Sequence, residues 1–473
     1  MTHSFDLTIP DVLADRRWSS RDEIAHLGGR WCRRLLETLG RPQQSIAVVL
    51  PTSAEGVALF LAVGSLPVPA VLLMPDPLTW RTEPPIPIGT TLVLPPSLAS
   101  LEPEARHIGC VPFLLPEEGG ASHDALTPLE TPGVVIFTSG STGRPKPVFR
   151  TIAGVLTAAM ARLTALGIRN GEGVLTGLPL AHGPGLGALL ASMALGGPFG
   201  LLGPIDHRAA LAMLARPEFS FWWATPHFAD VLGRCTLTGP AAAPKMCVIS
   251  SPISPRVFTA FLDRFGTPLR QTYASNETGA VSVDAGPPSG VRPETVGRPL
   301  PGVEVAVGET PRAPCRAGET GRIWVKSPWQ MHGYGFPPAL ERPGAIDDWW
   351  PTQDVGSFDG GRLILAGRID ECIRTRDSRL VNLAAVARSF QNAAGVRDAV
   401  VVRLEGSAGA SFGAVIEGEA ALTIDRLRRE LWNTMPSSSW PRRLVLVAAM
   451  PRLATGKPDR LRCQALLDGP EQS

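Results

Sequence analysis

The sequence predicts an α/β fold with a large N-terminal domain of helix-covered sheets and a small α+β domain at the C-terminus. Apolar runs of helix and strand length alternate before residue 130 and again from residue 174 to 215, which is typical of parallel sheets covered by helices. From about residue 295 the pattern becomes β-rich, and a compact tail follows residue 370. A chain of 473 residues is also too long for one ordinary core.

The first alternating region begins with a helix at Arg21–Leu39, whose apolar residues recur at helical spacing. Ser45–Leu50 then predicts a buried strand, Ala54–Val63 a helix and Val68–Leu73 a second strand. In the second region we expect, in the same way, strands at Val174–Leu178 and Phe199–Leu202 and helices at Leu186–Ala194 and Ala209–Ala215.

The later part of the chain contains shorter strands punctuated by Gly and Pro. We place a domain boundary at residue 370, so that residues 1–369 form the large domain, with a β-rich subdomain at about 295–369, and residues 370–473 form the small one. The predicted elements are strands at Val303–Val307, Gly321–Val325, Arg362–Ala366, Ala399–Leu404, Gly413–Glu417 and Arg443–Val447, and helices at Val381–Asn392 and Ile424–Trp432.

The composition excludes several classes of protein. A net charge of +2 gives no electrostatic reason to expect a nucleic-acid partner. Seven scattered cysteines, without a CxxC pair, argue against a disulfide framework or a zinc site and fit a cytoplasmic location. The first residues do not form a signal peptide. Two uncharged runs, Gly56–Pro75 and Gly183–Ile205, approach membrane-spanning length, but Gly and Pro interrupt them, so we expect a buried helix and strand in each.

A candidate phosphate-binding loop follows the predicted strand Val134–Phe137, in the run FTSGSTGRPK at 137–146. Glycines allow the backbone N–H groups to approach a polyphosphate, hydroxyl groups add donors, and a lysine adds a cation. The spacing is not that of a Walker A loop, and the alternative is a Ser/Gly/Thr-rich surface loop. The candidate residues are Thr138, Ser139, Gly140, Ser141, Thr142, Gly143 and Lys146.

This run resembles the phosphate loop of the adenylate-forming superfamily, which includes acyl- and aryl-CoA synthetases, adenylation domains of nonribosomal peptide synthetases, and luciferases. The segment YASNETG at 273–279 is similar to a second motif of that superfamily. The resemblance implies that Tyr273 stacks on adenine, that Glu277 holds Mg²⁺ and that Asn276 contacts phosphate. Ala274 and Asn276 depart from the usual Gly and Thr.

Two further segments resemble superfamily motifs. In PTQDVGSFDGGRLILAGR at 351–368, the resemblance implies that Asp354 accepts both ribose hydroxyls and that Arg368 binds the ribose or α-phosphate. In GRIDECIRTRDSR at 367–379, Asp370 takes the position of the hinge about which the mobile C-terminal domain turns. Asp377 stands where the superfamily usually has the glycine that lines the pantetheine tunnel.

A fourth segment, PRLATGKPDR at 451–460, resembles the late Gly-Lys motif of the superfamily. The resemblance implies that Lys457 touches the substrate carboxylate and the α-phosphate. A cation there would lower the barrier to the reaction of two anions. The four motifs occur in the expected order across residues 137–460, whereas the first 130 residues carry no diagnostic motif.

The resemblance also indicates the acid-binding pocket. His182, in PLAHGPG at 179–185, takes the place beside the reacting carboxyl group, and Trp223, Ser251 and Pro252 line the wall. Two adjacent tryptophans in one strand cannot both face a single pocket, and for either one packing in the core is an equal alternative. Amino-acid-activating relatives carry an acidic residue shortly after this histidine, and Gly183–Met193 contains none. We therefore expect a compact acid with an uncharged tail, aryl or aliphatic, rather than an amino acid.

The sequence thus predicts a cytoplasmic, ATP- and Mg²⁺-dependent ligase that forms an acyl-adenylate and transfers it to the pantetheine thiol of CoA or an acyl carrier protein. Its catalytic residues would be Lys457, Glu277 and His182. A mildly basic C-terminal face could dock an acidic carrier protein or could be ordinary solvated surface. Two alternatives remain: an adenylate-forming enzyme with a non-thiol second step, such as lactone formation, and a non-catalytic protein that binds a nucleotide or acyl-adenylate.

Overall fold

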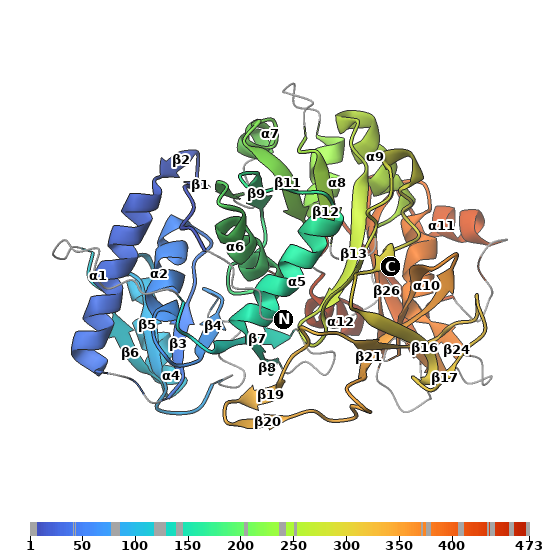
Figure 1. Cartoon of the computed structure of the whole chain (residues 1–473). Coiled ribbons are helices and arrows are strands. Elements are labelled where there is room, and N and C mark those ends of the chain that lie inside the picture. Colours follow the sequence, from blue (N-terminus) through green and yellow to red (C-terminus); the bar gives the residue numbers. More distant parts are fainter. Residues whose placement is uncertain are drawn as a thin grey trace.

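A computed structural model describes most of the chain. The described residues are 7–40, 42, 44–76, 86–117, 129–138, 145–202, 207–235, 243–249, 253–369, 372–374, 380–404, 411–432, 435, 440–453 and 458–469. Within them, two large sheets with helices between and around them form the N-terminal part, and a β-rich region and a small α+β unit follow (Figure 1).

The first large sheet has eight strands: β3 (Ile46–Val49), β4 (Ala70–Leu73), β5 (Thr91–Leu94), β6 (Val111–Leu114), β7 (Gly133–Thr138), β8 (Lys146–Thr151), β19 (Gly333–Phe336) and β20 (Ala339–Glu341). Their order is β20-β19-β8-β7-β4-β3-β5-β6, parallel from β7 to β6 and antiparallel at the other edge. Ile46 and Val48 face the main core, while Ala47 and Val49 face a second cluster on the opposite side. Burial on both faces explains the unbroken apolar runs in the sequence.

The second large sheet has nine strands: β1 (Val12–Ala14), β2 (Arg17–Ser19), β9 (Gly173–Thr176), β10 (Phe199–Leu201), β11 (Phe219–Ala224), β12 (Met246–Ile249), β13 (Leu269–Ser275), β14 (Gly279–Val283) and β15 (Arg298–Pro299). Their order is β15-β14-β13-β12-β11-β9-β10-β1-β2. The six central strands from β13 to β1 are parallel, and the strands at both edges are antiparallel.

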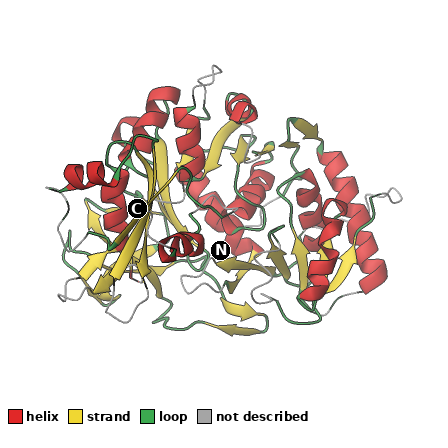
Figure 2. Cartoon of the chain, turned by 180° about the vertical axis from the view of Figure 1, so that it is seen from behind, coloured by secondary structure: helices red, strands yellow, loops and turns green. Residues whose placement is uncertain are grey.

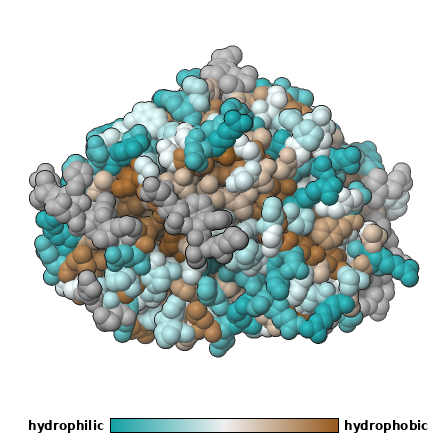
Figure 3. Space-filling view, in the orientation of Figure 1, coloured by the Kyte–Doolittle hydropathy of each residue, from teal (hydrophilic) through white to brown (hydrophobic). Residues whose placement is uncertain are grey.

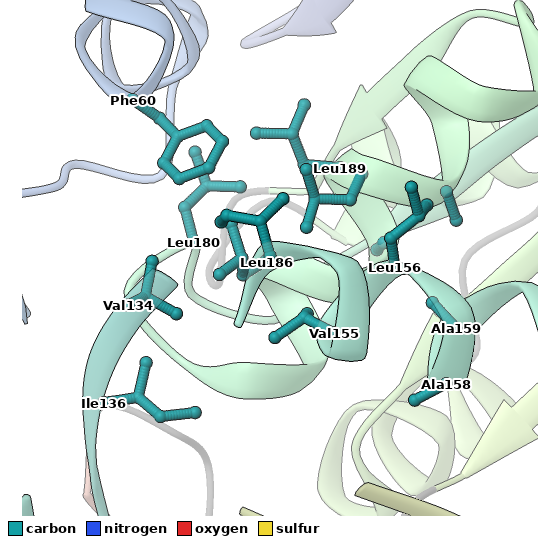
Figure 4. Close-up of a cluster of buried hydrophobic side chains, with 14 of the residues drawn as sticks. Phe60, Val134, Ile136, Val155, Leu156, Ala158, Ala159, Leu180, Leu186 and Leu189 are labelled. Carbon is teal, nitrogen blue, oxygen red and sulfur yellow. The ribbon is translucent and has the colours of Figure 1, made fainter. Parts of the chain in front are cut away.

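Helices cover both sheets (Figure 2). They are α1 (Arg21–Leu39), α2 (Ala54–Gly64), η1 (Pro96–Leu101), α4 (Glu102–His107), α5 (Ile152–Ala165), α6 (Gly183–Leu195), α7 (His207–Leu214), α8 (Pro226–Arg234), α9 (Pro255–Phe265) and η2 (Pro288–Gly290). α5 and α6 lie between the sheets, and in Figure 4 their side chains pack with Val134 and Ile136 of β7 and Phe60 of α2. Residues of α7, α8 and α9 pack on the opposite face of the nine-stranded sheet.

The β-rich region forms a five-stranded sheet in the order β17-β16-β18-β21-β22. Its strands are β16 (Glu304–Thr310), β17 (Ala313–Pro314), β18 (Gly321–Lys326), β21 (Trp350–Asp359) and β22 (Arg362–Arg368). All described neighbours in this sheet are antiparallel. This arrangement confirms the β-rich character that the sequence predicts after residue 295.

The C-terminal unit has its own buried clusters, in which every described member lies at residue 373 or beyond. It contains β23 (Cys372–Arg374), β24 (Leu380–Asn382), α10 (Leu383–Gln391), β25 (Val396–Leu404), β26 (Ser411–Gly418), α11 (Ile424–Leu431), β27 (Arg443–Val447) and α12 (Arg460–Asp468). β25, β26 and β27 form one sheet, and β23 and β24 form a short hairpin. α10 packs on β25 and also reaches back to β22, where Arg388 donates to the Ala366 carbonyl at 2.9 Å.

The structure confirms the predicted α/β fold and the nature of the two uncharged runs. Each run contains a short helix followed by a short strand, α2 with β4 and α6 with β10. None of the described helices is long and apolar enough to cross a membrane. On the face of the molecule seen in Figure 3, hydrophobic side chains gather toward the middle and hydrophilic ones along the upper and lower margins.

Candidate active site

A hydrogen bond joins two of the predicted nucleotide-binding residues. Tyr273 lies near the end of β13, and Asp354 lies in β21 of a different sheet. The Tyr273 hydroxyl donates to Asp354 Oδ2 at 2.6 Å, and the tyrosine is 5% exposed. Burial, and then the Asp354 carboxylate, raise the pKa of Tyr273 well above its usual value, so the hydroxyl stays a donor. The Asp354 carboxylate is therefore held in one orientation.

Asp354 also faces Arg368 across the antiparallel pair of β21 and β22. Arg368 Nη1 lies 3.9 Å from Asp354 Oδ1, while the Asp354 backbone N–H donates to Thr352 Oγ1 at 3.2 Å. Residues directly opposite in an antiparallel pair have neighbouring side chains. The hairpin thus brings together the two residues that the sequence assigns to the ribose and α-phosphate.

Glu277 has a partner that the sequence analysis missed. The hydroxyl of Tyr334, in β19, donates to Glu277 Oε1 at 2.8 Å. Burial, and then the nearby Glu277 carboxylate, raise the pKa of Tyr334. Lys146 Nζ lies 5.5 Å from the centre of the same ring. The chain has two tyrosines, and both lie in this site, which is a signal that composition alone could have given.

Arg150, in β8, is a second residue that sequence reasoning missed. It is 5% exposed and donates through Nη2 to the carbonyl oxygens of Trp329 at 2.9 Å and Gly154 at 3.2 Å. Burial lowers its pKa to about 10, while the field of Glu277 acts in the opposite direction. Gly279, at φ +70°, permits this contact, since a Cβ there would lie 2.8 Å from Arg150 Nη2.

The described ends of the phosphate loop lie beside the second motif. Thr138 and Lys146 are paired across the β7–β8 hairpin, and the Lys146 N–H donates to Thr138 Oγ1 at 3.4 Å. Asn276 Nδ2 donates to the carbonyl oxygen of Phe137 at 3.2 Å. The other candidate loop residues, Ser139, Gly140, Ser141, Thr142 and Gly143, lie outside the described residues.

On the acid side, His182 is half-buried at the N-cap of α6. Trp223 is 3% exposed and belongs to the core cluster between the sheets, whereas Trp222 belongs to the cluster on the opposite face. The expectation that the two adjacent tryptophans face opposite ways is confirmed. Ser251 and Pro252 lie outside the described residues.

Lys457 and Asp370 lie outside the described residues too, as does Asp377. The flanks of Lys457 are described: Arg452 and Pro458 form an antiparallel β-bridge. Arg452 donates to Asp398 at 2.6 Å. The charge of Arg452 reaches His227 on α8, whose pKa is lowered first by burial and then by this arginine. One end of the C-terminal unit therefore lies against the nine-stranded sheet's outer helices.

The side chains of the described residues indicate how a magnesium ion could be held in this site. Among them, no three His, Cys, Asp or Glu side chains cluster closely enough to hold a metal by themselves. Mg²⁺ in phosphate-binding sites usually takes one or two carboxylates and fills its other positions with water and phosphate oxygens. Glu277, a single carboxylate whose neighbour Asn276 donates to Phe137 at the start of the loop, therefore fits an ion that arrives with a nucleotide rather than a resident metal.

Comparison with known proteins identifies the kind of chain. The sequence profile of the AMP-binding enzyme family matches residues 93–335, about half of the chain. A medium/long-chain-fatty-acid–[acyl-carrier-protein] ligase of Mycobacterium tuberculosis, FadD10, is 26% identical over 95% of this chain and 91% of its own length. A non-canonical nonribosomal peptide synthetase of Salinispora arenicola, CymA, is also 26% identical over 96% of this chain, which spans 6% of that much longer protein.

The fold is similar to that of solved structures as well. The amide bond synthetase McbA from Marinactinospora thermotolerans superposes with a TM-score of 0.80 at 23% identity, over 98% of this chain and 97% of McbA. At this identity the likeness concerns the fold. It confirms the predicted arrangement of a large N-terminal part and a small C-terminal unit.

Proposed function

This chain belongs to the AMP-binding family of adenylate-forming enzymes, and from that premise we propose that it activates a carboxylic acid with ATP and transfers the acyl group to a pantetheine thiol. The observation that carries the proposal is the contact of Tyr273, Asp354 and Arg368, which come from separate strands and meet with Asp354 between the other two. A carboxylate held between a phenol and a guanidinium suits the vicinal hydroxyls of a ribose.

In this proposal Tyr273 and Asp354 hold the nucleoside, and Arg368 the ribose or α-phosphate. Lys146 and the loop from Thr138 to Gly143 hold the β- and γ-phosphates, with Asn276 as a further phosphate contact. Magnesium, when bound at Glu277, neutralises phosphate charge. Tyr334 keeps the Glu277 carboxylate in place through its hydrogen bond.

The proposed reaction has two steps. The substrate carboxylate oxygen attacks the α-phosphorus of ATP, the bond to the β-phosphate oxygen breaks, and pyrophosphate leaves. The acceptor thiol then loses its proton to solvent, the thiolate attacks the acyl carbon, and the bond from that carbon to the AMP oxygen breaks. Lys457 offsets the negative charge of the first step, and His182 lies beside the carboxyl group.

We also propose two domains, residues 1–369 and 370–473, with rotation about Asp370 between the steps. The separate buried clusters of the C-terminal unit support this division. Among the described contacts between the two parts, Arg256 donates to the Val396 carbonyl and Arg388 donates to that of Ala366.

The acid in this proposal is an aryl or compact aliphatic acid rather than an amino acid. None of the side chains of α6, from Gly183 to Leu195, is acidic, so this helix offers no group that could pair with an ammonium. Burying an unpaired ammonium is costly. Trp223, with Ser251 and Pro252, would form the wall of the acid pocket.

CoA or an acyl carrier protein is the proposed acceptor, with FadD10 as a relative whose name states transfer to a carrier protein. A nitrogen acceptor is the second candidate, because the fold resembles that of an amide bond synthetase and because Asp377 replaces the usual tunnel glycine. A non-thiol oxygen acceptor, as in lactone formation, belongs to the same alternative.

The experiment is pyrophosphate exchange with a panel of acids, comparing the protein with Lys457→Ala. We expect the exchange rate to fall by about 100- to 1000-fold, the usual effect of removing one group that stabilises developing charge. Lys245→Ala removes an exposed lysine of the N-terminal part and is the matched control. Unchanged exchange in Lys457→Ala would refute the catalytic assignment, and no exchange with any acid would favour a non-catalytic binding protein.

The acceptor is identified by adding CoA, a phosphopantetheinylated carrier protein or a simple amine to the adenylating mixture. A thioester supports the proposal. An amide as the sole product favours the nitrogen acceptor.

A further inference from the structure

One charged residue lies where a helix should carry an apolar side chain. The buried residues of α5 include Val155, Ala158, Ala159 and Leu163, and Arg162 continues the same stripe at helical spacing. Arg162 is 2% exposed. Arginine is rarely buried to this extent unless it is paired, so this position requires an explanation.

No anionic partner for Arg162 lies within the described part of the chain. Its Nε and Nη1 atoms are buried and have no hydrogen-bond partner there. The charged side chain whose field reaches it is Arg150, another cation. Burial, and then Arg150, lower the pKa of Arg162 to about 9, so the guanidinium still carries its charge at neutral pH. An uncompensated buried charge of this kind is strongly unfavourable without a partner.

The guanidinium lies over an aromatic ring that the proposed function places in the acid pocket. Arg162 Cζ is 4.1 Å from the centre of the Trp223 ring. A guanidinium that stacks on a ring keeps its N–H groups directed outward in its own plane. The stacking therefore holds Arg162 in place and leaves its donors for another molecule.

Two glycines of α6 show how far Trp223 lies from Asn276 along this helix. A Cβ at Gly183 would lie 2.7 Å from Asn276 Oδ1, and a Cβ at Gly187 would lie 3.9 Å from Trp223 Cζ3. Residues four apart share one face of a helix and are separated by about 6 Å along its axis. Trp223, on which Arg162 stacks, thus lies about one helical turn along α6 from Asn276, a separation comparable with the length of a short acid.

We propose that Arg162 determines specificity by binding a second, distal anionic group of the acid, so that the substrate is a compact dicarboxylic acid. Its first carboxylate reacts near His182, and its second accepts hydrogen bonds from the guanidinium. This inference rests on the proposed function and revises the expectation of an uncharged tail. The lack of acidic residues in α6, which argues against an ammonium, agrees with an anionic tail as well.

The test uses pairs of acids that differ in one carboxylate: glutarate with pentanoate, adipate with hexanoate, and phthalate with benzoate. For the best pair we expect pyrophosphate exchange to favour the diacid by about 100-fold in kcat/KM, since a site built for a polar group rejects an analogue that lacks it. Arg162→Met keeps the length of the side chain and removes the charge. It should lose this factor for the diacid and retain the rate for the monoacid.

Thermal unfolding gives a readout that does not depend on catalysis. Without ligand, Arg162→Met should be at least as stable as the parent protein, because it removes an unpaired buried cation. The diacid should raise the melting temperature of the parent protein and leave that of Arg162→Met unchanged. Arg162→Lys, which keeps a charge without the planar donors, should respond partially. Arg208→Met, at an exposed position of α7, is the control and should behave as the parent protein does.

Two results would overturn the proposal: an equal preference for diacid and monoacid in the parent protein, or a preference that Arg162→Met leaves unchanged. A lower melting temperature of Arg162→Met with unaltered acid preference would assign the arginine to packing alone. If no acid supports exchange, the proposed function fails, and the diacid-dependent shift in melting temperature still decides whether Arg162 binds the second anion.

Discussion

The candidate site has a nucleotide side, formed around Asp354 and Glu277, and an acid side, formed around Trp223 and Arg162. The two sides differ in whether other side chains of the protein pair with their charged groups. On the nucleotide side, Asp354 is contacted by Tyr273 and Arg368, and Glu277 accepts a hydrogen bond from Tyr334. On the acid side, Arg162 is buried, stacks on an aromatic ring, and has no acidic partner in the described chain.

This difference indicates which charged groups of the site have their partners within the protein and which would gain a partner only when a ligand binds. A carboxylate held by neighbouring donors is already oriented before a ligand binds, which favours a ligand of fixed shape such as a nucleotide. A buried cation without a partner is completed when an anion arrives, so the choice of acid can depend on that one group. The nucleotide side would then be common to many substrates, and the acid side would discriminate between them.

The largest effect should come from breaking the nucleotide side at Asp354. Asp354→Asn keeps the shape of the side chain and an acceptor for Tyr273, but it removes the charge that faces Arg368. We expect kcat/KM for ATP to fall by about 100-fold, since removing one partner of a close charge pair in a binding site usually has an effect of this size. Steady-state kinetics at saturating acid would measure it.

The comparison also predicts what Asp354→Asn leaves intact. The ratio of rates for a diacid and its matched monoacid should stay as in the parent protein, because the acid side is untouched. Asp359→Asn, at the exposed end of the same strand, is the control and should change neither quantity. A change in acid preference in Asp354→Asn would mean that the two sides are not independent.

Local patterns in the sequence predicted the fold class and a part of its helices and strands. The helix expected at Arg21–Leu39 has these bounds in the structure, where Ser20 and Glu23 form a capping box at its start. The strands expected at Ser45–Leu50, Val68–Leu73, Val174–Leu178 and Phe199–Leu202 match β3, β4, β9 and β10 within two residues, because burial on both faces leaves continuous apolar runs. These signals depend on neighbours in the chain, which a sequence displays directly.

The missed residues depend on contacts between distant segments. Tyr334 donates a hydrogen bond to Glu277, and Arg162 stacks on Trp223. In both pairs the two residues are far apart in the sequence. Each had a weak signal: tyrosine is rare in this chain, and Arg162 interrupts an apolar stripe. Such signals mark a position as unusual, but the partner that explains it follows only from the packing of the sheets.

A smaller effect, on KM for the acid, should follow from adding a methyl group on the acid side at Gly187 of α6. A Cβ there would lie 3.6 Å from Ala159 Cβ, an ordinary contact, so Gly187→Ala fits the helix. Alanine in a helix interior is more favourable than glycine by about 0.5–1 kcal/mol, so the melting temperature should rise. We expect KM for the acid to increase about tenfold, the effect of one added methyl group in a close pocket, with KM for ATP unchanged. A lower melting temperature, or a change confined to ATP, would contradict this division of the site.

The smallest effect concerns the pH dependence of stability at His227, which lies on α8 of the N-terminal part within the field of Arg452 from the C-terminal unit. Burial, and then the positive charge of Arg452, lower its pKa below the ordinary value of 6.5, against the opposing fields of Glu417, Asp230 and Asp398. The unfolded chain takes up a proton as the pH falls below this value, while the folded protein remains neutral until lower pH. The stability that His227 contributes is therefore present above pH 6.5 and is lost as the pH falls toward its folded pKa.

His227→Gln cannot take up this proton, so its melting temperature should fall less steeply than that of the parent protein below pH 6.5. Melting curves at several pH values would measure the difference in slope, and the exposed His107→Gln, on α4, should follow the parent protein. Parallel slopes for His227→Gln and the parent would show that the histidine is solvated like any surface residue. A shallower slope would show that His227 is shielded from protonation in the folded protein, as its burial on α8 and the nearby charge of Arg452 imply.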